Sequence, residues 1–147
     1  MNQKAHTINK LFSRETIVSV VINASPEKIW GILTNIQGYK NWNSTLVSIE
    51  GEIQAGGRVR LISKLDPKRT FKLSVKTFEP PTKLAWGDMM GSRVYSLTQE
   101  GGGTLFTMTE KIGGPLFPLF AKMIPSFDQS FDQFASDIKK EAEKNNL

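Results

Sequence analysis

Hydrophobic and polar positions change their spacing near the start of the chain, where one predicted element leads into another. Apolar residues first recur at every second position, as on one face of a half-buried strand: Val18, Val20 and Ile22. A turn follows in which Ser25 is placed to cap a helix and Pro26 to occupy its first position. Apolar residues then recur at helical spacing: Ile29, Trp30, Leu33 and Ile36. The pattern predicts a strand followed directly by an amphipathic helix.

Alternation continues through the middle of the chain and predicts a series of further strands. Residues 45–53 place Val47 and Ile49 on one face, and residues 71–77 alternate apolar or small side chains with lysines. Similar patterns lie at 59–63, 84–86, 93–98 and 104–111. Turn residues separate them at Gly56-Gly57, Asp66-Pro67, Pro80-Pro81 and Gly101-Gly102-Gly103. Short turns between successive strands predict an antiparallel meander.

The C-terminal part of the chain reads as helical. After a break at residues 113–115, apolar residues are spaced four, three and four apart: Phe127, Phe131, Phe134 and Ile138. A sheet must bury its apolar face, so we expect this helix to cover it. The segment 116–124 lies between prolines at 118 and 125, and we expect it to form a separate or kinked helical piece.

The order of these elements and several short motifs resemble the START-like, or SRPBCC, superfamily, and most closely its polyketide cyclase/dehydrase-like branch. The motifs are Ala24 to Trp30, the group Tyr39, Trp42 and Asn43, Glu79-Pro80-Pro81 with Leu84 and Trp86, and Gly102-Gly103-Thr104 ahead of Glu110. The resemblance spans residues 16–143. It implies an α+β helix-grip fold: a curved antiparallel sheet of about six to seven strands wrapped around a long C-terminal helix, with one or two short helices after the first strand. This fold closes around a hydrophobic cavity.

Length and composition fit one domain. With 147 residues, the chain is long enough to bury a core, and we expect a single SRPBCC/START-like domain over residues 15–147. Residues 1–14 are polar apart from Leu11 and Phe12 and are expected to form a flexible N-terminal arm. The sequence has no cysteine, which excludes disulfides and thiolate chemistry and is compatible with a cytoplasmic location.

Strand parity predicts which side chains face the space between sheet and helix. The candidate ligand-binding residues are Trp30, Trp42, Leu61, Phe71, Leu73, Trp86, Asp88, Arg93, Tyr95, Phe106, Met108, Glu110, Phe127 and Phe131. An unpaired charge in an apolar interior costs several kcal/mol, so Arg93 should pair with Glu110 or Asp88. Two interpretations stay open. Arg93 could orient a ligand carboxylate, phosphate or enolate oxygen, or the pair could be a structural ion pair at the sheet edge.

The favoured function is the binding of a small hydrophobic or lipid-like molecule, as carrier or sensor. The resemblance also implies an alternative, a cyclase/dehydratase-like enzyme in which Glu110 is the general base and Arg93 or Tyr95 stabilises an enolate. Catalysis is less favoured, because the sole histidine, His6, lies in the predicted arm and no Ser/His/Asp or Cys/His set can be assembled. A second alternative is a chaperone-adaptor-like interaction module with a filled interior. We expect no cofactor and no metal.

Two surface features leave the partners open. Basic residues gather on outward strand positions and in a nearby hairpin: Arg58, Arg60, Lys72, Lys76, Lys64, Lys68 and Arg69. Aromatic residues do not alternate with them, so we favour a solvated face and expect no nucleic-acid partner. The apolar segment 116–120 could be a lid, a membrane-touching loop, a dimer contact or, by default, core. We expect no stable membrane insertion, whereas transient membrane contact and a monomer or homodimer remain possible.

Overall fold

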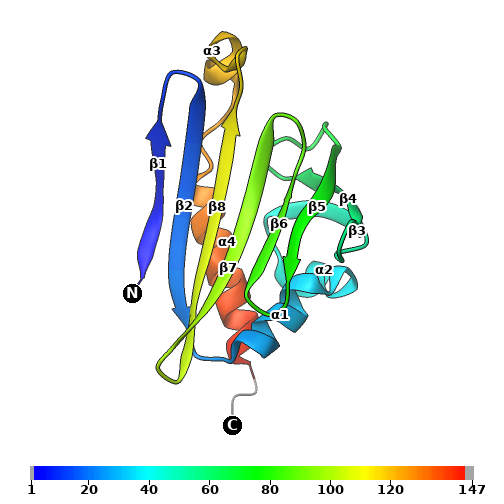
Figure 1. Ribbon diagram of the computed structural model, residues 1–147, viewed down its shortest axis with the longest axis vertical. Helices are drawn as coiled ribbons and strands as arrows, with labels where there is room; N and C mark the ends of the chain where they lie inside the picture. Colours follow the sequence, from blue (N-terminus) through cyan, green and yellow to red (C-terminus); the bar gives the residue numbers. More distant parts are fainter. Residues whose placement is uncertain (1, 145–147) are drawn as a thin grey trace.

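The computed structural model describes residues 2–144, which form one curved antiparallel sheet with a long helix along one face (Figure 1). The strands are β1 (Gln3–Asn9), β2 (Ser13–Ile22), β3 (Leu46–Gly51), β4 (Arg58–Ser63), β5 (Phe71–Glu79), β6 (Lys83–Gly87), β7 (Gly91–Glu100) and β8 (Gly103–Gly113). Their order in the sheet is β1-β2-β8-β7-β6-β5-β4-β3. The predicted α+β helix-grip architecture is confirmed, with eight strands in place of the six to seven expected.

The helices occupy the positions that the sequence predicts. They are α1 (Pro26–Thr34), the 3-10 turn η1 (Ile36–Gly38), α2 (Tyr39–Trp42), α3 (Phe117–Phe120), the 3-10 turn η2 (Ala121–Met123) and α4 (Asp128–Glu143). Ser25 caps α1 as expected, because its hydroxyl oxygen accepts a hydrogen bond of 3.1 Å from the backbone N–H of Lys28. No helix among residues 2–144 is long and apolar enough to cross a membrane.

Helix α4 packs its apolar stripe against the sheet, with contacts to β2 and to α1. Phe131, Phe134 and Ile138 are buried, and Phe127 at its start is half-buried. The helix is also anchored by a buried carboxylate. Asp137 Oδ2 accepts hydrogen bonds from the backbone N–H and the hydroxyl of Ser44, at 2.8 and 2.7 Å. These contacts fix the helix relative to the strands that surround the cavity described below.

The N-terminal segment is not the flexible arm that its composition predicted. Residues 3–9 form the edge strand β1, which pairs with β2 through matches such as His6 with Ile17. Two hydrogen bonds also join β1 to α4: Ala5 N–H donates to Asp132 and Thr7 Oγ1 to Asp128. An edge strand with mostly exposed side chains needs no apolar alternation, so the pattern that identified the other strands was missing here.

The strand at residues 45–53 also differs from its prediction. Val47 was expected to point inward with Ile49, but Val47 is 55% exposed. A register shift between Leu46 and Ser48 in the pairing of β3 with β4 breaks the two-residue period. Leu46 and Ile49 therefore are half-buried, and Val47 faces solvent on the edge strand.

A pH dependence is predicted at the end of α4. The carboxylate of Glu143 accepts hydrogen bonds from Asn23 N–H at 2.8 Å and from Lys139 Nζ at 2.5 Å, and these bonds lower the pKa of Glu143. Because the folded pKa lies below the unfolded one, the stabilisation is complete above about pH 4.5 and is lost as the pH falls through the folded pKa.

Thermal unfolding of the wild type and of Glu143→Gln at pH 7 and pH 3 checks this pH dependence. We expect the wild type to have the higher Tm at pH 7, by a modest margin that narrows towards pH 3. A difference in Tm that is the same at both pH values would contradict the assignment.

Candidate ligand-binding cavity

A cavity of about 530 Å³ lies between the sheet and the first turn of α4. It sits at the end of the sheet where β4, β6 and β8 end and β5 and β7 begin, and we call this the cavity end (Figure 1). Its walls come from the start of β3, from β4 to β8 with the β4–β5 hairpin, from residues 120–125 and from residues 127–131. The volume falls within the range of roughly 300–1,000 Å³ that is typical of small-molecule sites.

Most of the predicted site residues line this cavity, and apolar side chains dominate among them. The lining includes Leu61, Phe71, Leu73, Trp86, Asp88, Arg93, Glu110, Phe127 and Phe131. Strand parity indicated the inward direction of five of them, because β4, β5, β7 and β8 keep an unbroken alternation through this region: Leu61, Phe71, Leu73, Arg93 and Glu110.

The other predicted lining residues do not line the cavity. Trp30, Tyr95, Phe106 and Met108 belong to the packed core, and the half-buried Trp42 packs against that core. The ring of Phe134 fills this part of the interior, with centroids 5.4 Å from Trp42, 5.8 Å from Tyr95 and 6.1 Å from Phe106. Trp30 packs against Phe78 at 5.4 Å, so it does not approach the cavity mouth. The aromatic cluster around Phe134 therefore closes the interior on one side of the cavity.

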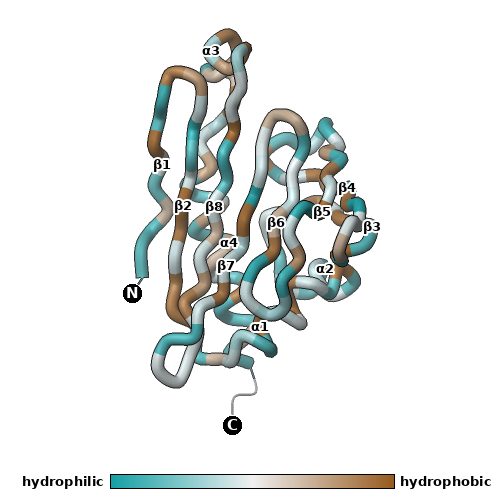
Figure 2. Tube along the Cα trace, viewed as in Figure 1, coloured by the Kyte–Doolittle hydropathy of each residue, from teal (hydrophilic) through white to brown (hydrophobic). Residues whose placement is uncertain are grey.

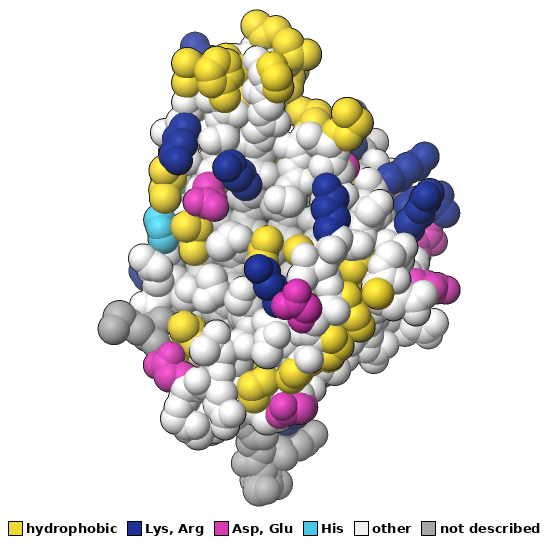
Figure 3. Space-filling model, in the orientation of Figure 1, with side chains coloured by type: hydrophobic (Ala, Val, Ile, Leu, Met, Phe, Trp, Pro, Cys, Tyr) yellow, Lys and Arg dark blue, Asp and Glu magenta, His cyan; other side chains and the backbone are white. Residues whose placement is uncertain are grey.

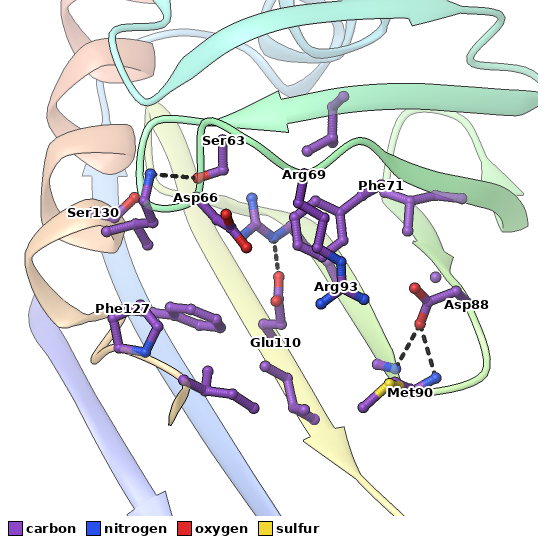
Figure 4. Close-up of a pocket in the computed structure, with 18 of the residues that line it drawn as sticks. Ser63, Asp66, Arg69, Phe71, Asp88, Met90, Arg93, Glu110, Phe127 and Ser130 are labelled. Atoms are coloured by element: carbon purple, nitrogen blue, oxygen red, sulfur yellow. Dashed lines mark hydrogen bonds and ion pairs between the residues drawn. The ribbon is translucent and has the colours of Figure 1, made fainter. Parts of the chain in front are cut away.

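Arg93 and Glu110 form the ion pair that parity suggested. They face each other directly across β7 and β8, and Arg93 Nε donates to Glu110 Oε1 at 2.6 Å (Figure 4). Each side chain is 20% exposed. The guanidinium also lies over the ring of Phe131, 5.0 Å from its centroid. A charged pair thus stands in a cavity whose remaining walls are largely apolar.

Asp88 is not the partner of Arg93. Its Oδ1 accepts hydrogen bonds from the backbone N–H groups of Met90 and Gly91, at 2.8 and 2.9 Å (Figure 4). These bonds shape the turn between β6 and β7, as an aspartate commonly does in a tight turn. Asp88 therefore lines the cavity, but its carboxylate is engaged in holding the β6–β7 turn.

The electrostatics of this cluster keep Arg93 charged and Tyr95 neutral. Burial opposes the charge of Arg93, but the nearby Glu110 and Tyr95 outweigh this effect and raise the pKa of the guanidinium. Burial raises the pKa of the Tyr95 phenol, and the neighbouring Arg93 opposes that rise. At neutral pH the cavity thus offers a permanent cation at Arg93, whereas the neutral hydroxyl of Tyr95 lies in the packed core.

Several lining residues were not anticipated from the sequence. The hairpin between β4 and β5 contributes Leu65, Asp66 and Arg69, whose guanidinium lies 4.5 Å from the centroid of Phe71. Loops carry no periodicity, so no pattern indicated them. Ile112 and Ser130 also line the cavity. Both could have been found, because Ile112 shares the parity of Glu110 and Ser130 lies about one helical turn after Phe127.

One wall of the cavity is the segment 120–125, which follows the apolar run at 116–120. Arg14 on β2 holds this wall through hydrogen bonds from its guanidinium to the carbonyl oxygens of Ile124 at 3.0 Å and Ala121 at 2.9 Å. Phe120, Met123 and Ile124 line the cavity. The default expectation that 116–120 is core holds only for Phe117, because Leu116 and Leu119 are 62% and 79% exposed.

The chain matches a protein-family model described as "Polyketide cyclase / dehydrase and lipid transport" over residues 14–143. No curated protein is significantly similar to it in sequence. Among solved structures, protein MLL2253 from Mesorhizobium loti is 20% identical with a TM-score of 0.71, covering 91% of this chain and 100% of that chain. A START superfamily protein from Mycobacterium smegmatis is 16% identical with a TM-score of 0.64, covering 88% and 97%.

A third similar structure is the di-domain ARO/CYC BexL from the BE-7585A biosynthetic pathway. It is 10% identical with a TM-score of 0.70, and the match covers 93% of this chain and 52% of that chain. The structural similarity to these three proteins shows a shared START-like fold. The family assignment follows from the match of the family model to residues 14–143. The chain belongs to the polyketide cyclase / dehydrase and lipid transport family.

Proposed function

We propose that the protein binds a small hydrophobic or lipid-like molecule between the sheet and α4, as a carrier or sensor. The observation that carries the proposal is the cavity of about 530 Å³, which has largely apolar walls and a charged pair set into them. Sites of this kind, with a few polar groups in an apolar pocket, are typical of small-molecule binding. We include a cytoplasmic location in the proposal, since the sequence contains no cysteine.

The energetics favour a guest with both an apolar body and a polar end. Burying about 300 Å² of apolar guest surface yields a gross gain of about 7 kcal/mol. Association and ordering consume much of this gain, so micromolar affinity, about −8 kcal/mol, needs polar anchoring as well. Arg93 is suited to this task, because a guanidinium has about five donor N–H groups and the bond to Glu110 uses only Nε–H. A carboxylate, phosphate or enolate oxygen on the guest would match it.

Native mass spectrometry of the protein purified from its own host tests the proposal directly. We expect a co-purifying lipid or aromatic molecule, and an increase in Tm with members of a panel of hydrophobic ligands. Repeated absence of a bound molecule, together with no change in Tm across the panel, would refute it.

A cavity-filling substitution gives a sharper prediction. Leu73 lines the cavity from β5, so the larger ring in Leu73→Trp should occupy the guest's place. We expect binding of the guest, or of a fluorescent fatty acid used in its place, to weaken at least about tenfold while the fold is retained. Val47→Trp is the matched control, because Val47 is exposed and lies outside the cavity. Equal binding by the wild type and Leu73→Trp would place the guest elsewhere.

A cyclase or dehydratase activity is the second candidate, and the Arg93–Glu110 pair favours it. Both groups lie in the cavity, where Glu110 could take a proton and Arg93 could stabilise an enolate. Glu110→Gln separates the two functions. For an enzyme, this substitution abolishes turnover of a bound enolisable substrate and leaves binding nearly intact. A chaperone-adaptor-like module was predicted to have a filled interior, and the cavity speaks against that alternative.

A further inference from the structure

Exposed apolar side chains are concentrated at the cavity end of the molecule. Among the residues that the structure describes, ten large hydrophobic side chains are exposed, and eight of them lie in the turns, the hairpin and the segment after β8 at this end. We call these eight the apolar rim: Leu11, Phe12, Leu65, Met89, Met90, Leu116, Leu119 and Met123. Isolated exposed apolar residues are normal, but a cluster of this kind marks an interaction site.

The topology explains how distant parts of the sequence meet in the rim. The β1–β2 turn, the β4–β5 hairpin, the β6–β7 turn and the segment after β8 all leave the sheet at the same end. Hydrophobic segments cap that end in Figure 2, and apolar side chains gather there in Figure 3. Leu65, Met90 and Met123 also line the cavity, so the rim adjoins the cavity mouth.

Positive charge accompanies the rim. Exposed lysines lie within its loops or beside them: Lys10, Lys64, Lys68, Lys111 and Lys122. The acidic residues of the same loops, Asp66 and Asp88, are half-buried, and Asp88 is engaged by backbone N–H groups. The rim therefore presents protruding apolar tips flanked by cations, which is the composition that binds the surface of an anionic membrane.

The shape and charge of the rim favour a bilayer over a second copy of the chain. Met89 in the β6–β7 turn is fully exposed and Leu119 in α3 is 79% exposed, so these two side chains protrude from separate segments. In a twofold dimer built on this end, the same patch would face itself and bring lysine clusters close together. An interface of lipid headgroups accepts separate apolar tips and pairs with the lysines.

We propose that the apolar rim docks the cavity mouth onto membranes that contain anionic lipid. The contact depends on the rim and its lysines, whereas the proposed function depends on the cavity, so the two can fail separately. The role of this contact rests on the proposed function. A cavity mouth held against the bilayer would let an amphiphilic guest pass between lipid and cavity with little exposure to water.

Vesicle flotation tests the apolar part of the proposal, with vesicles of phosphatidylcholine and phosphatidylserine. We expect the wild type to bind, and the double variant Met89→Asp/Leu119→Asp to bind at least about tenfold more weakly. Neither residue lines the cavity, so binding of a soluble fluorescent fatty acid should be unchanged. Val47→Asp is the matched control, since it places the same charge on an exposed apolar position outside the rim.

The charge part of the proposal has its own test. Lys10→Glu and Lys122→Glu should each weaken binding to the anionic vesicles about fivefold or more, because one basic residue near such a surface contributes about that factor. Lys140→Glu, near the other end of α4, should have little effect. Raising the salt concentration should weaken wild-type binding, and vesicles of phosphatidylcholine alone should bind poorly.

Three outcomes would overturn the docking proposal. Wild-type protein that does not float with anionic vesicles would do so, as would rim variants that bind as well as the wild type. A dimer in light scattering that Met89→Asp/Leu119→Asp dissociates, without vesicle binding, would show that the rim is a self-interface. A wild type that binds anionic vesicles but does not bind the fluorescent fatty acid would instead count against the proposed function and support the docking surface.

Discussion

Replacing Phe134 by alanine is expected to lower the free energy of unfolding by about 3–5 kcal/mol. Phe134 is 2% exposed and contacts the rings of Trp42, Tyr95 and Phe106. Removing the ring therefore leaves a void between α4 and the sheet as well as forfeiting the transfer of its apolar surface from water. For a chain of this length we expect a fall in Tm on the order of 10 °C.

Urea and thermal unfolding measure this effect, and Phe12→Ala is the matched control. Phe12 is 54% exposed in the β1–β2 turn, so the same substitution there should change stability by less than about 1 kcal/mol. Phe134→Ala with a stability within about 1 kcal/mol of the wild type would contradict the assignment of the aromatic cluster as core. Such a result would also support the original prediction that the ligand cavity extends to Tyr95.

Removing one member of the Arg93–Glu110 pair is expected to have the second largest effect. Arg93→Met leaves the carboxylate of Glu110 without its partner in a site where only a fifth of the side chain is exposed. Breaking a fully buried pair in this way costs about 3–5 kcal/mol, and partial exposure reduces the cost here to about 2 kcal/mol. Glu110→Leu should be destabilising for the converse reason, with the guanidinium left unpaired.

The double variant Arg93→Met/Glu110→Leu distinguishes a structural ion pair from a ligand anchor. Two apolar side chains of similar size need no partner, so most of the lost stability should return. Binding of a guest with a carboxylate end should not return, because the cation that would hold it is absent. If the double variant binds such a guest as tightly as the wild type, Arg93 serves the fold alone.

Strands with one buried and one solvent-exposed face were predictable from the sequence, whereas the edge strands of the sheet were not. Alternation identified β4 and β5 because their inward side chains are largely apolar and most of their outward ones polar, and it identified β2 from the inward Val18, Val20 and Ile22. Strand β1 has exposed side chains at both ends and no apolar alternation, and its position in the sheet is set by its pairing with β2. At Val47 a local shift of register reverses the expected direction, and the sequence pattern alone does not reveal a bulge of this kind.

For the candidate site, parity predicted direction but not depth. It correctly turned Arg93 and Glu110 inward on neighbouring strands, which is sufficient to pair them. Tyr95 and Met108 have the same direction one step further along, yet α4 covers them and they lie in the core. Whether an inward position meets a void or a ring depends on where Phe134 sits on α4, which is tertiary information that no single strand contains.

The hydrogen bonds of Arg14 to the segment 120–125 determine what would break if a guest exchanged past this wall. Three of its guanidinium hydrogen bonds, to the carbonyl oxygens of Ala121, Ile124 and Pro125, join this wall to β2, and the wall belongs to no strand of the sheet. Moving this wall outward would therefore break a few hydrogen bonds to carbonyl groups, which water can replace, and would leave the backbone hydrogen bonds between strands intact. If a guest exchanges past this wall, its residence time and the stability of the sheet depend on separate parts of the chain, and selection can tune one without sacrificing the other.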